Sequence, residues 1–249
     1  MLSRREFVTL AGTTLTAFSS TTLAGQQRAG DGRLPVTFTR TATTSAKAGT
    51  HPLGLGEGGR DGVLHVPDGL APGPAPLMLL LHGAGGTGRR QLGRMIDAIN
   101  KAGVVVLAPD SRGATWDAIR GRFSDDVAFI GRALEKTFNA VAVDPDRLTI
   151  AGFSDGATYA LSLGLLNGAL FTRIAAFSPG FGIDGPPAGK PKIFISHGTN
   201  DRVLPIDRCS RAIVPVLEAR GYQVTFREFS GGHEIPATVR AEAFGWMAE

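Results

Sequence analysis

Short apolar runs alternate along this chain with longer segments whose apolar residues recur at the spacing of a helix. A continuous run of about five apolar residues, bounded by turn residues, is typical of a strand buried on both faces of a parallel sheet. Helical spacing separates these runs, so the pattern predicts an α/β fold: a mostly parallel central sheet with helices on both faces. The runs occupy residues 77–81, 104–108, 147–151, 192–196 and 224–229, and the helical segments occupy 91–102, 123–140 and 157–166.

The length of the chain and the positions of its Gly- and Pro-rich segments predict a single folded domain. A chain of 249 residues can bury a full core. Residues 25–60 are rich in Gly, Thr and Ala with little apolar periodicity, so we expect an irregular N-terminal arm there. The domain is expected to span residues 61–249 and to begin with an antiparallel strand near residues 63–66. We expect no large lid, because the Pro- and Gly-rich stretch 177–191 is predicted to be a loop that borders the site.

The first residues have the pattern of an export signal. Arg4 and Arg5 precede an uncharged, moderately apolar stretch that ends in small residues at Ala24. This arrangement predicts a twin-arginine signal over residues 1–24, and hence a periplasmic or secreted protein. A basic amphipathic start or a retained anchor is the alternative. Because the apolar part is short and rich in Thr, Ser and Gly, we expect no stable membrane insertion after processing.

The charge of the chain restricts its possible binding partners only slightly, and its cysteine content restricts its cross-links. Lys and Arg (26) exceed Asp and Glu (22), but no run of like charge is longer than two residues. Scattered basic residues do not make the continuous patch typical of nucleic-acid binding, so no nucleic-acid partner is expected. Cys209 is the sole cysteine, which excludes an internal disulfide.

The strongest chemical signal is at residues 152–156, which read Gly-Phe-Ser-Asp-Gly. They lie between a predicted strand and a predicted helix, the context in which G-x-S-x-G forms a nucleophile elbow. Glycines at both ends let the backbone turn tightly, so that the central residue can hold a strained conformation and expose its hydroxyl. Ser154 is therefore the candidate nucleophile. A simple Gly/Ser turn is the alternative for the motif taken alone.

A serine hydroxyl needs a neighbouring base, and the base needs an acid to orient it. Asp201 follows the predicted strand 192–196, and His233 follows the predicted strand 224–229. The chain order Ser, Asp, His at the ends of successive strands is that of an α/β-hydrolase triad. We therefore predict Asp201 as the acid and His233 as the base. A helix cap and an ordinary loop histidine are the alternatives.

A tetrahedral intermediate needs donors for its oxyanion. Residues 82–86 read His-Gly-Ala-Gly-Gly and follow the strand 77–81. We assign one donor to the N–H of Ala84, with Gly83 as the alternative, and the other to the N–H of Asp155. The side chains of His82 and His197 are expected to bond within the fold.

No metal or other cofactor is expected. A zinc site built from histidines and Asp201 is conceivable, but no H-E-x-x-H sequence or cysteine pair supports one.

These motifs together resemble the α/β-hydrolase superfamily. Within it they resemble small serine esterases of the phospholipase/carboxylesterase type and the poly(3-hydroxybutyrate)-depolymerase-like esterases. The resemblance runs from about Gly62 to the C-terminus. It rests on residues 81–83 (Leu-His-Gly), 108–113 (Ala-Pro-Asp-Ser-Arg-Gly), 152–156, 197–201 (His-Gly-Thr-Asn-Asp) and 232–234 (Gly-His-Glu).

The chain departs from these families after the serine, where they often carry Gln or a small residue and this chain has Asp155. A carboxylate there is expected to disfavour anionic acyl chains. Gly83 and Trp116 are the candidate pocket residues, although Trp116 fits ordinary core packing equally well.

The predicted function is hydrolysis of short-chain carboxylic esters through an acyl-enzyme on Ser154. The alternatives are a depolymerase acting on polyhydroxyalkanoate-type polyester, an acyltransferase on the same scaffold, and a non-catalytic binding module.

Overall fold

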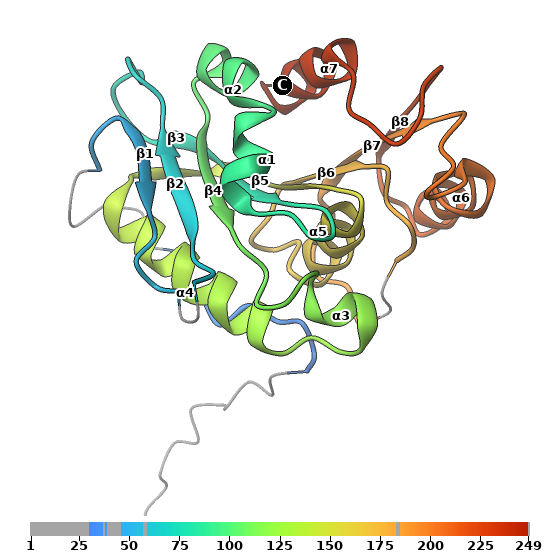
Figure 1. Cartoon of the computed structure of the whole chain (residues 1–249), viewed down its shortest axis with the longest axis horizontal. Helices are drawn as coiled ribbons and strands as arrows, with labels where there is room; N and C mark the ends of the chain where they lie inside the picture. Colours follow the sequence, from blue (N-terminus) through green and yellow to red (C-terminus); the bar gives the residue numbers. More distant parts are fainter. Residues whose placement is uncertain (1–29, 37, 39–45, 57–58, 183–184, 249) are drawn as a thin grey trace, which may run out of the picture.

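The computed structural model describes residues 30–36, 38, 46–56, 59–182 and 185–248 (Figure 1). The predicted export signal, residues 1–24, lies outside them. Within the described residues, eight strands form one sheet in the order β1-β2-β4-β3-β5-β6-β7-β8. The strands are β1 (Gly49–Pro52), β2 (Gly62–Val66), β3 (Ala75–Leu81), β4 (Val105–Pro109), β5 (Val143–Phe153), β6 (Arg173–Phe177), β7 (Lys192–Gly198) and β8 (Val224–Phe229).

The sheet is parallel except at one edge, where β1 pairs with β2 and β2 pairs with β4 in antiparallel fashion. The predicted mostly parallel sheet is confirmed, and the antiparallel strand expected near residues 63–66 is β2. Because the remaining strands share one direction, their C-terminal ends meet at one edge of the sheet. The loops that leave β3, β5, β7 and β8 therefore lie near one another, which is where α/β folds place functional groups.

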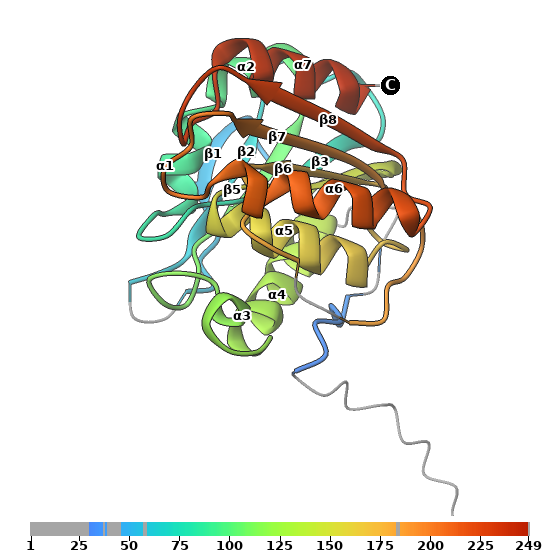
Figure 2. The same ribbon diagram turned by 90° about the vertical axis from the view of Figure 1, so that its right-hand side faces the viewer.

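Helices cover both faces of the sheet (Figure 2). One face carries α1 (Gly88–Gly93), α2 (Ile96–Ala102) and α7 (Ala237–Ala248). The other carries α3 (Asp117–Arg120), α4 (Asp125–Ala140), α5 (Asp155–Leu166) and α6 (Ser210–Ala219), the last preceded by the short 3-10 helix η1 (Ile206–Arg208). No helix in the described part of the chain is long and apolar enough to cross a membrane.

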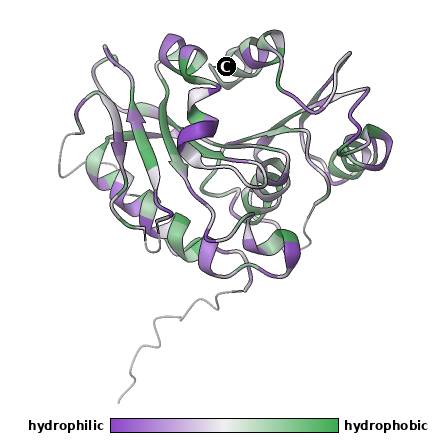
Figure 3. Ribbon diagram, in the orientation of Figure 1, coloured by the Kyte–Doolittle hydropathy of each residue, from purple (hydrophilic) through white to green (hydrophobic). Residues whose placement is uncertain are grey.

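The core consists of two layers, one on each side of the sheet. Along β3, Leu77, Leu79 and Leu81 face the layer that holds α4, α5 and α6, whereas Met78 and Leu80 face the layer under α1, α2 and α7. Successive strand residues point to opposite faces. Because both faces are buried, the strand has no polar face, which explains its uninterrupted apolar run. Figure 3 shows the hydrophobic colours gathered along the central strands and α5.

The predicted boundary at residue 61 is wrong, because part of the predicted arm belongs to the domain. β1 extends the sheet by pairing residues 49–52 with β2. Upstream, Leu34 is buried, and its N–H donates to Oδ1 of Asn167 at 2.9 Å. A short edge strand exposed on one side has no long apolar run, and that is why the sequence pattern missed it.

Two predicted helices also differ in detail. The helical spacing over residues 91–102 corresponds to two helices, α1 and α2, which are separated at Arg94 and Met95. The segment 123–140 forms α4 from Asp125 onward, and α3 precedes it. Asp126 is buried at the start of α4, where its carboxylate accepts the N–H groups of Arg112 and Asp117 at 2.6 and 2.7 Å.

Glycines 152 and 156 allow β5 to turn directly into α5. A Cβ on Gly152 would lie 2.1 Å from the carbonyl oxygen of Gly156, and a Cβ on Gly156 would lie 2.4 Å from the carbonyl oxygen of Leu81. These are backbone atoms of the sheet and the helix, which cannot move aside as a flexible side chain can. The predicted steric role of these glycines is therefore confirmed.

We expect Gly156→Ala to lower the free energy of unfolding by about 3 kcal/mol, since overpacking at a rigid site costs on the order of 1–3 kcal/mol or more. The matched control is Gly245→Ala within α7, where an added Cβ meets nothing within 4 Å. That variant should gain roughly 0.5–1 kcal/mol from helix propensity. Urea unfolding of both variants tests the expectation, and equal effects would contradict it.

Candidate active site

Ser154 lies at the sharp turn between β5 and α5. Its backbone has φ 58° and ψ −124°, a left-handed conformation that residues other than glycine rarely adopt. Holding such a residue costs on the order of 1–3 kcal/mol, so the surrounding structure must impose it. The close approach at Gly152 and Gly156 does so, together with the hydrogen bond from the N–H of Ser154 to the carbonyl oxygen of Phe177 at 2.9 Å.

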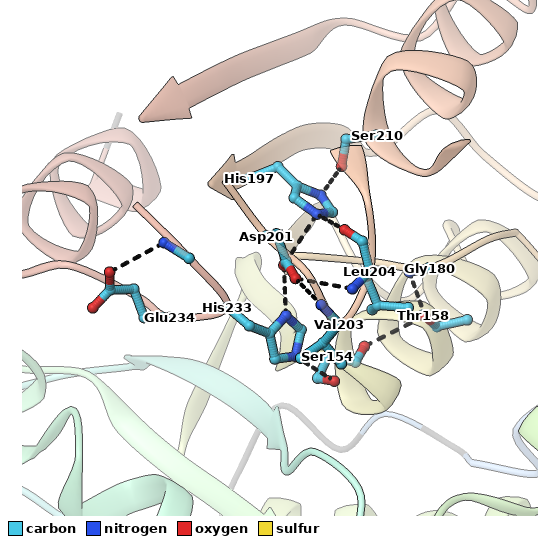
Figure 4. A network of polar contacts seen from close by, with 11 residues as sticks. Ser154, Thr158, Gly180, His197, Asp201, Val203, Leu204, Ser210, His233 and Glu234 are labelled. Atoms are coloured by element: carbon cyan, nitrogen blue, oxygen red, sulfur yellow. Dashed lines mark hydrogen bonds and ion pairs between the residues drawn. The ribbon is translucent and has the colours of Figure 1, made fainter. Parts of the chain in front are cut away.

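His233 comes from the loop between β8 and α7, and its ring lies against the hydroxyl of Ser154 (Figure 4). Nε2 of His233 is 2.8 Å from Oγ of Ser154, and Nδ1 is 2.6 Å from Oδ2 of Asp201. Because a carboxylate oxygen can only accept, Nδ1 carries the proton, and Nε2 of the neutral ring is left to accept from the serine hydroxyl. The ring of Phe153 packs on that of His233 at a centroid distance of 4.7 Å and limits its movement.

Asp201 follows β7, and both oxygens of its carboxylate accept hydrogen bonds. Oδ1 accepts the N–H groups of Val203 and Leu204, each at 2.9 Å, while Oδ2 accepts from His233. Burial alone would raise the pKa of Asp201, but the bonds from Leu204, His233 and Val203 together hold that pKa below its ordinary value. Asp201 is therefore ionised, and it orients the ring of His233.

His197 supports Asp201 from the strand side. Its Nε2 lies 2.7 Å from the carbonyl oxygen of Leu204 and 3.3 Å from Oδ2 of Asp201, and its Nδ1 lies 2.7 Å from Oγ of Ser210. A carbonyl oxygen only accepts, so Nε2 donates and Nδ1 accepts from the serine. Burial lowers the pKa of His197, so that the ring is neutral. Both ring nitrogens of His197 therefore form hydrogen bonds within the fold, as expected.

The loop after β3, residues 82–86, is fixed by hydrogen bonds close to Ser154. His82 accepts the N–H of Ser111 on Nε2 at 3.0 Å, so its Nδ1 carries the proton and donates to the carbonyl oxygen of Gly83 at 2.8 Å. The N–H of Gly86 donates to the same oxygen at 3.0 Å. In a trans peptide the C=O and the N–H point to opposite sides, so two bonds to the oxygen of Gly83 also fix the direction of the N–H of Ala84.

The two N–H groups assigned as oxyanion donors are those of Ala84 and Asp155. Neither the N–H of Ala84 nor that of Asp155 has a hydrogen-bond partner within the described part of the chain. The Ala84 loop is close, since a Cβ on Gly83 would lie 3.3 Å from Cβ of Ser154. Asp155 is the first residue of α5, where the helix dipole favours an anion.

Trp116 is not a pocket residue, which corrects one of the two readings of the sequence. Its side chain is fully buried, its Nε1 donates to the carbonyl oxygen of His82 at 2.8 Å, and its ring stacks on that of Tyr159. Trp116 therefore supports the loop of residues 82–86 from inside the core. In a sequence, a single Trp after a strand looks the same whether it lines a pocket or packs in the core.

A cavity of about 320 Å³ contains Ser154 and His233. Gly83 and Ala84 line it as expected. Arg90, Arg94 and Val203 line it too, and they were not among the residues expected from the sequence. Arg90 lies in α1 and Arg94 directly follows this helix, which comes soon after the loop of residues 82–86. The carboxylate of Asp155, by contrast, is turned toward Thr115, whose Oγ1 donates to Oδ2 of Asp155 at 2.6 Å.

Within the described part of the chain, no group of three or more His, Cys, Asp or Glu side chains is arranged to hold a metal ion. The hydrogen bonds described above join Asp201 to His233 and join both Asp201 and His197 to the backbone of Leu204.

No protein-family model matches the sequence. The chain is 31% identical over 160 residues to feruloyl esterase C of Emericella nidulans, covering 60% of this chain and 57% of that protein. It is 29% identical over 153 residues to NocK of Nocardia uniformis, a proposed esterase, covering 57% of this chain and 44% of NocK. The chain thus spans only about half the length of these two relatives.

The fold is shared with solved esterase structures. A Bacillus cereus carboxylesterase superposes with a TM-score of 0.60 at 19% identity, covering 77% of this chain and 95% of that structure. The esterase PE8 gives a TM-score of 0.59 at 22% identity, with 75% and 97% covered. At these identities the likeness shows a shared α/β fold, and the two relatives that match in sequence are proteins named as esterases.

The buried histidines predict how stability responds to acid. Burial lowers the pKa of both His82 and His197 from 6.5, so below about pH 6.5 the unfolded chain binds protons that the folded chain excludes. The free energy of unfolding should therefore fall as the pH decreases from 7 to 5. Urea unfolding across this range measures the slope. His197→Gln should make it shallower, and an unchanged slope in this variant would contradict the assignment.

Proposed function

We propose that this protein is a serine esterase that hydrolyses carboxylic esters through an acyl-enzyme on Ser154. The observation that carries the proposal is the continuous hydrogen-bonded line from Asp201 through His233 to Ser154, with spacings of 2.6 and 2.8 Å. This is the order of acid, base and nucleophile that activates a serine hydroxyl. The similarity to feruloyl esterase C supports the same chemistry.

In the first half of the reaction, Oγ of Ser154 attacks the ester carbonyl carbon while Nε2 of His233 takes the hydroxyl proton. The carbonyl oxygen becomes an oxyanion, which accepts from the N–H groups of Ala84 and Asp155. Asp201 stabilises the imidazolium that forms. Collapse of the intermediate breaks the bond to the alcohol oxygen, which leaves with the proton from His233, and the acyl group remains on Ser154.

In the second half, water attacks the acyl-enzyme and gives its proton to His233. The same N–H groups hold the second oxyanion. Collapse then returns the proton to Oγ of Ser154 and releases the carboxylic acid. If an alcohol took the place of water, the product would be a new ester, which is the acyltransferase alternative.

The size of the site favours short acyl groups. The cavity around Ser154 has about 320 Å³, and the described residues of the connection between β6 and β7 form no helix that could cover it. Long acyl chains need a large apolar surface, which a mobile cover usually shields from water. The exposed ends of a short-hydroxyacid polyester would also fit an open site, so a depolymerase remains the second candidate.

Export through a twin-arginine signal remains part of the proposal. Arg4 and Arg5, followed by the apolar stretch to Ala24, support it.

Removing the hydroxyl of Ser154 should abolish ester hydrolysis. Loss of a triad member costs on the order of 10⁴-fold or more in kcat. Ser154→Ala and Ser154→Gly both lack the nucleophile, and the glycine variant also adopts a positive φ without strain, so its fold is secure. Assays with 4-nitrophenyl acetate measure turnover. A folded glycine variant with turnover near that of the native protein would overturn the proposal.

Acyl chain length provides a second test of the site. We expect kcat/KM for 4-nitrophenyl esters to be highest between acetyl and butyryl and to fall for acyl chains of twelve carbons and longer. A clearing assay on poly(3-hydroxybutyrate), run beside it, separates a small-ester enzyme from a depolymerase. A steady rise of kcat/KM up to sixteen carbons would contradict an open, shallow site.

A further inference from the structure

Two arginines line the same cavity as the nucleophile. Arg90 and Arg94 are four residues apart in and just after α1, so their side chains emerge on one side of it. Both line the cavity that contains Ser154 and His233, and both are exposed to solvent.

No carboxylate among the described residues pairs with these two guanidinium groups. In the described residues Arg147, Arg211 and Arg227 are paired with carboxylates, whereas other exposed arginines, such as Arg89 and Arg202, are not. No such ion pair involves Arg90 or Arg94 in the described part of the chain. Their charge is therefore free to act on whatever enters the cavity.

A second cavity, of about 330 Å³, is also lined by His233. It shares four residues with the first cavity: Gln91, Arg94, Phe153 and His233. Arg240 also lines it and is held in place, because its Nη1 donates to the carbonyl oxygen of Arg94 at 2.8 Å. Among the described residues, Glu234 is the one carboxylate on either cavity, against three guanidinium groups.

Asp155, the carboxylate expected to repel anions, does not oppose this charge at the cavity. Its Oδ2 accepts from the hydroxyl of Thr115, and Asp155 lines neither cavity. The expectation for Asp155 concerns anionic acyl chains, whereas the charge of the two cavities is set by three guanidinium groups against one carboxylate.

His233 indicates which part of the substrate meets this charge. In the proposed mechanism the ring hands its proton to the leaving alcohol, so the alcohol part of the ester must lie beside His233. The second cavity borders His233 and continues the first through Arg94. We infer that the site prefers esters whose alcohol part carries a carboxylate, bound by Arg94 with Arg90 adding to the attraction. A guanidinium fork matches a carboxylate in shape and charge. This inference rests on the proposed esterase function.

The test compares two acetyl esters that differ in charge and little in shape, 4-acetoxybenzoate and 4-acetoxybenzamide. The native protein should hydrolyse the anionic ester with a higher kcat/KM than the neutral amide. Arg94→Gln and Arg90→Gln should each lower kcat/KM for the anionic ester by about 3- to 10-fold, as expected for a partly exposed charge pair, and leave the neutral ester within about twofold. Added salt should reduce the preference in the native protein.

Arg89→Gln is the matched control, because Arg89 is exposed on the same helix and lines neither cavity. It removes the same charge and should keep the preference. Equal kcat/KM for the two esters in the native protein would overturn the inference, as would an equal loss of preference in all three variants or no loss in Arg90→Gln and Arg94→Gln. If neither ester were hydrolysed, the proposed esterase function itself would fail.

Discussion

The left-handed backbone of Ser154 is the constraint on which the rest of the site depends. A residue with a side chain adopts this conformation only when its surroundings impose it. Here the carbonyl of Phe177 on the neighbouring strand receives its N–H, and the lack of side chains at Gly152 and Gly156 lets the sheet, the elbow and the helix touch backbone to backbone. The same turn directs the hydroxyl toward His233. It also puts the N–H of Asp155 at the start of a helix, where no group among the described residues accepts from it.

Neutral histidines organise the two loops that flank this turn. His82 fixes the peptide between Gly83 and Ala84, and His197 fixes the carbonyl of Leu204 beside the carboxylate of Asp201. In both rings one nitrogen donates and the other accepts, so protonation would remove an acceptor as well as add a buried charge. Burial lowers the pKa of each ring and thereby keeps both in the form that the hydrogen bonds require. The site therefore depends on buried rings whose hydrogen bonds are made within the fold.

The sequence predicted those features that depend on local pattern. Continuous apolar runs gave the parallel strands, and three short polar motifs at strand ends gave the residues that meet as Ser154, Asp201 and His233. Features that depend on tertiary contact were missed. β1 is a short edge strand without an apolar run, and Trp116 occupies a core position that its neighbours in sequence do not distinguish from a pocket wall. Arg90 and Arg94 read as ordinary surface residues of a helix, because their place beside His233 depends on how α1 packs against the sheet.

The central claim is that Ser154 is acylated while the N–H groups of Ala84 and Asp155 hold the oxyanion. A crystal structure of the protein after reaction with a small alkyl fluorophosphonate tests both parts at once, because the tetrahedral phosphonyl group imitates the intermediate. The account predicts one adduct on Oγ of Ser154, with its phosphoryl oxygen within hydrogen-bond distance of both N–H groups. An unmodified Ser154, or an adduct whose oxygen points away from these N–H groups, would contradict it.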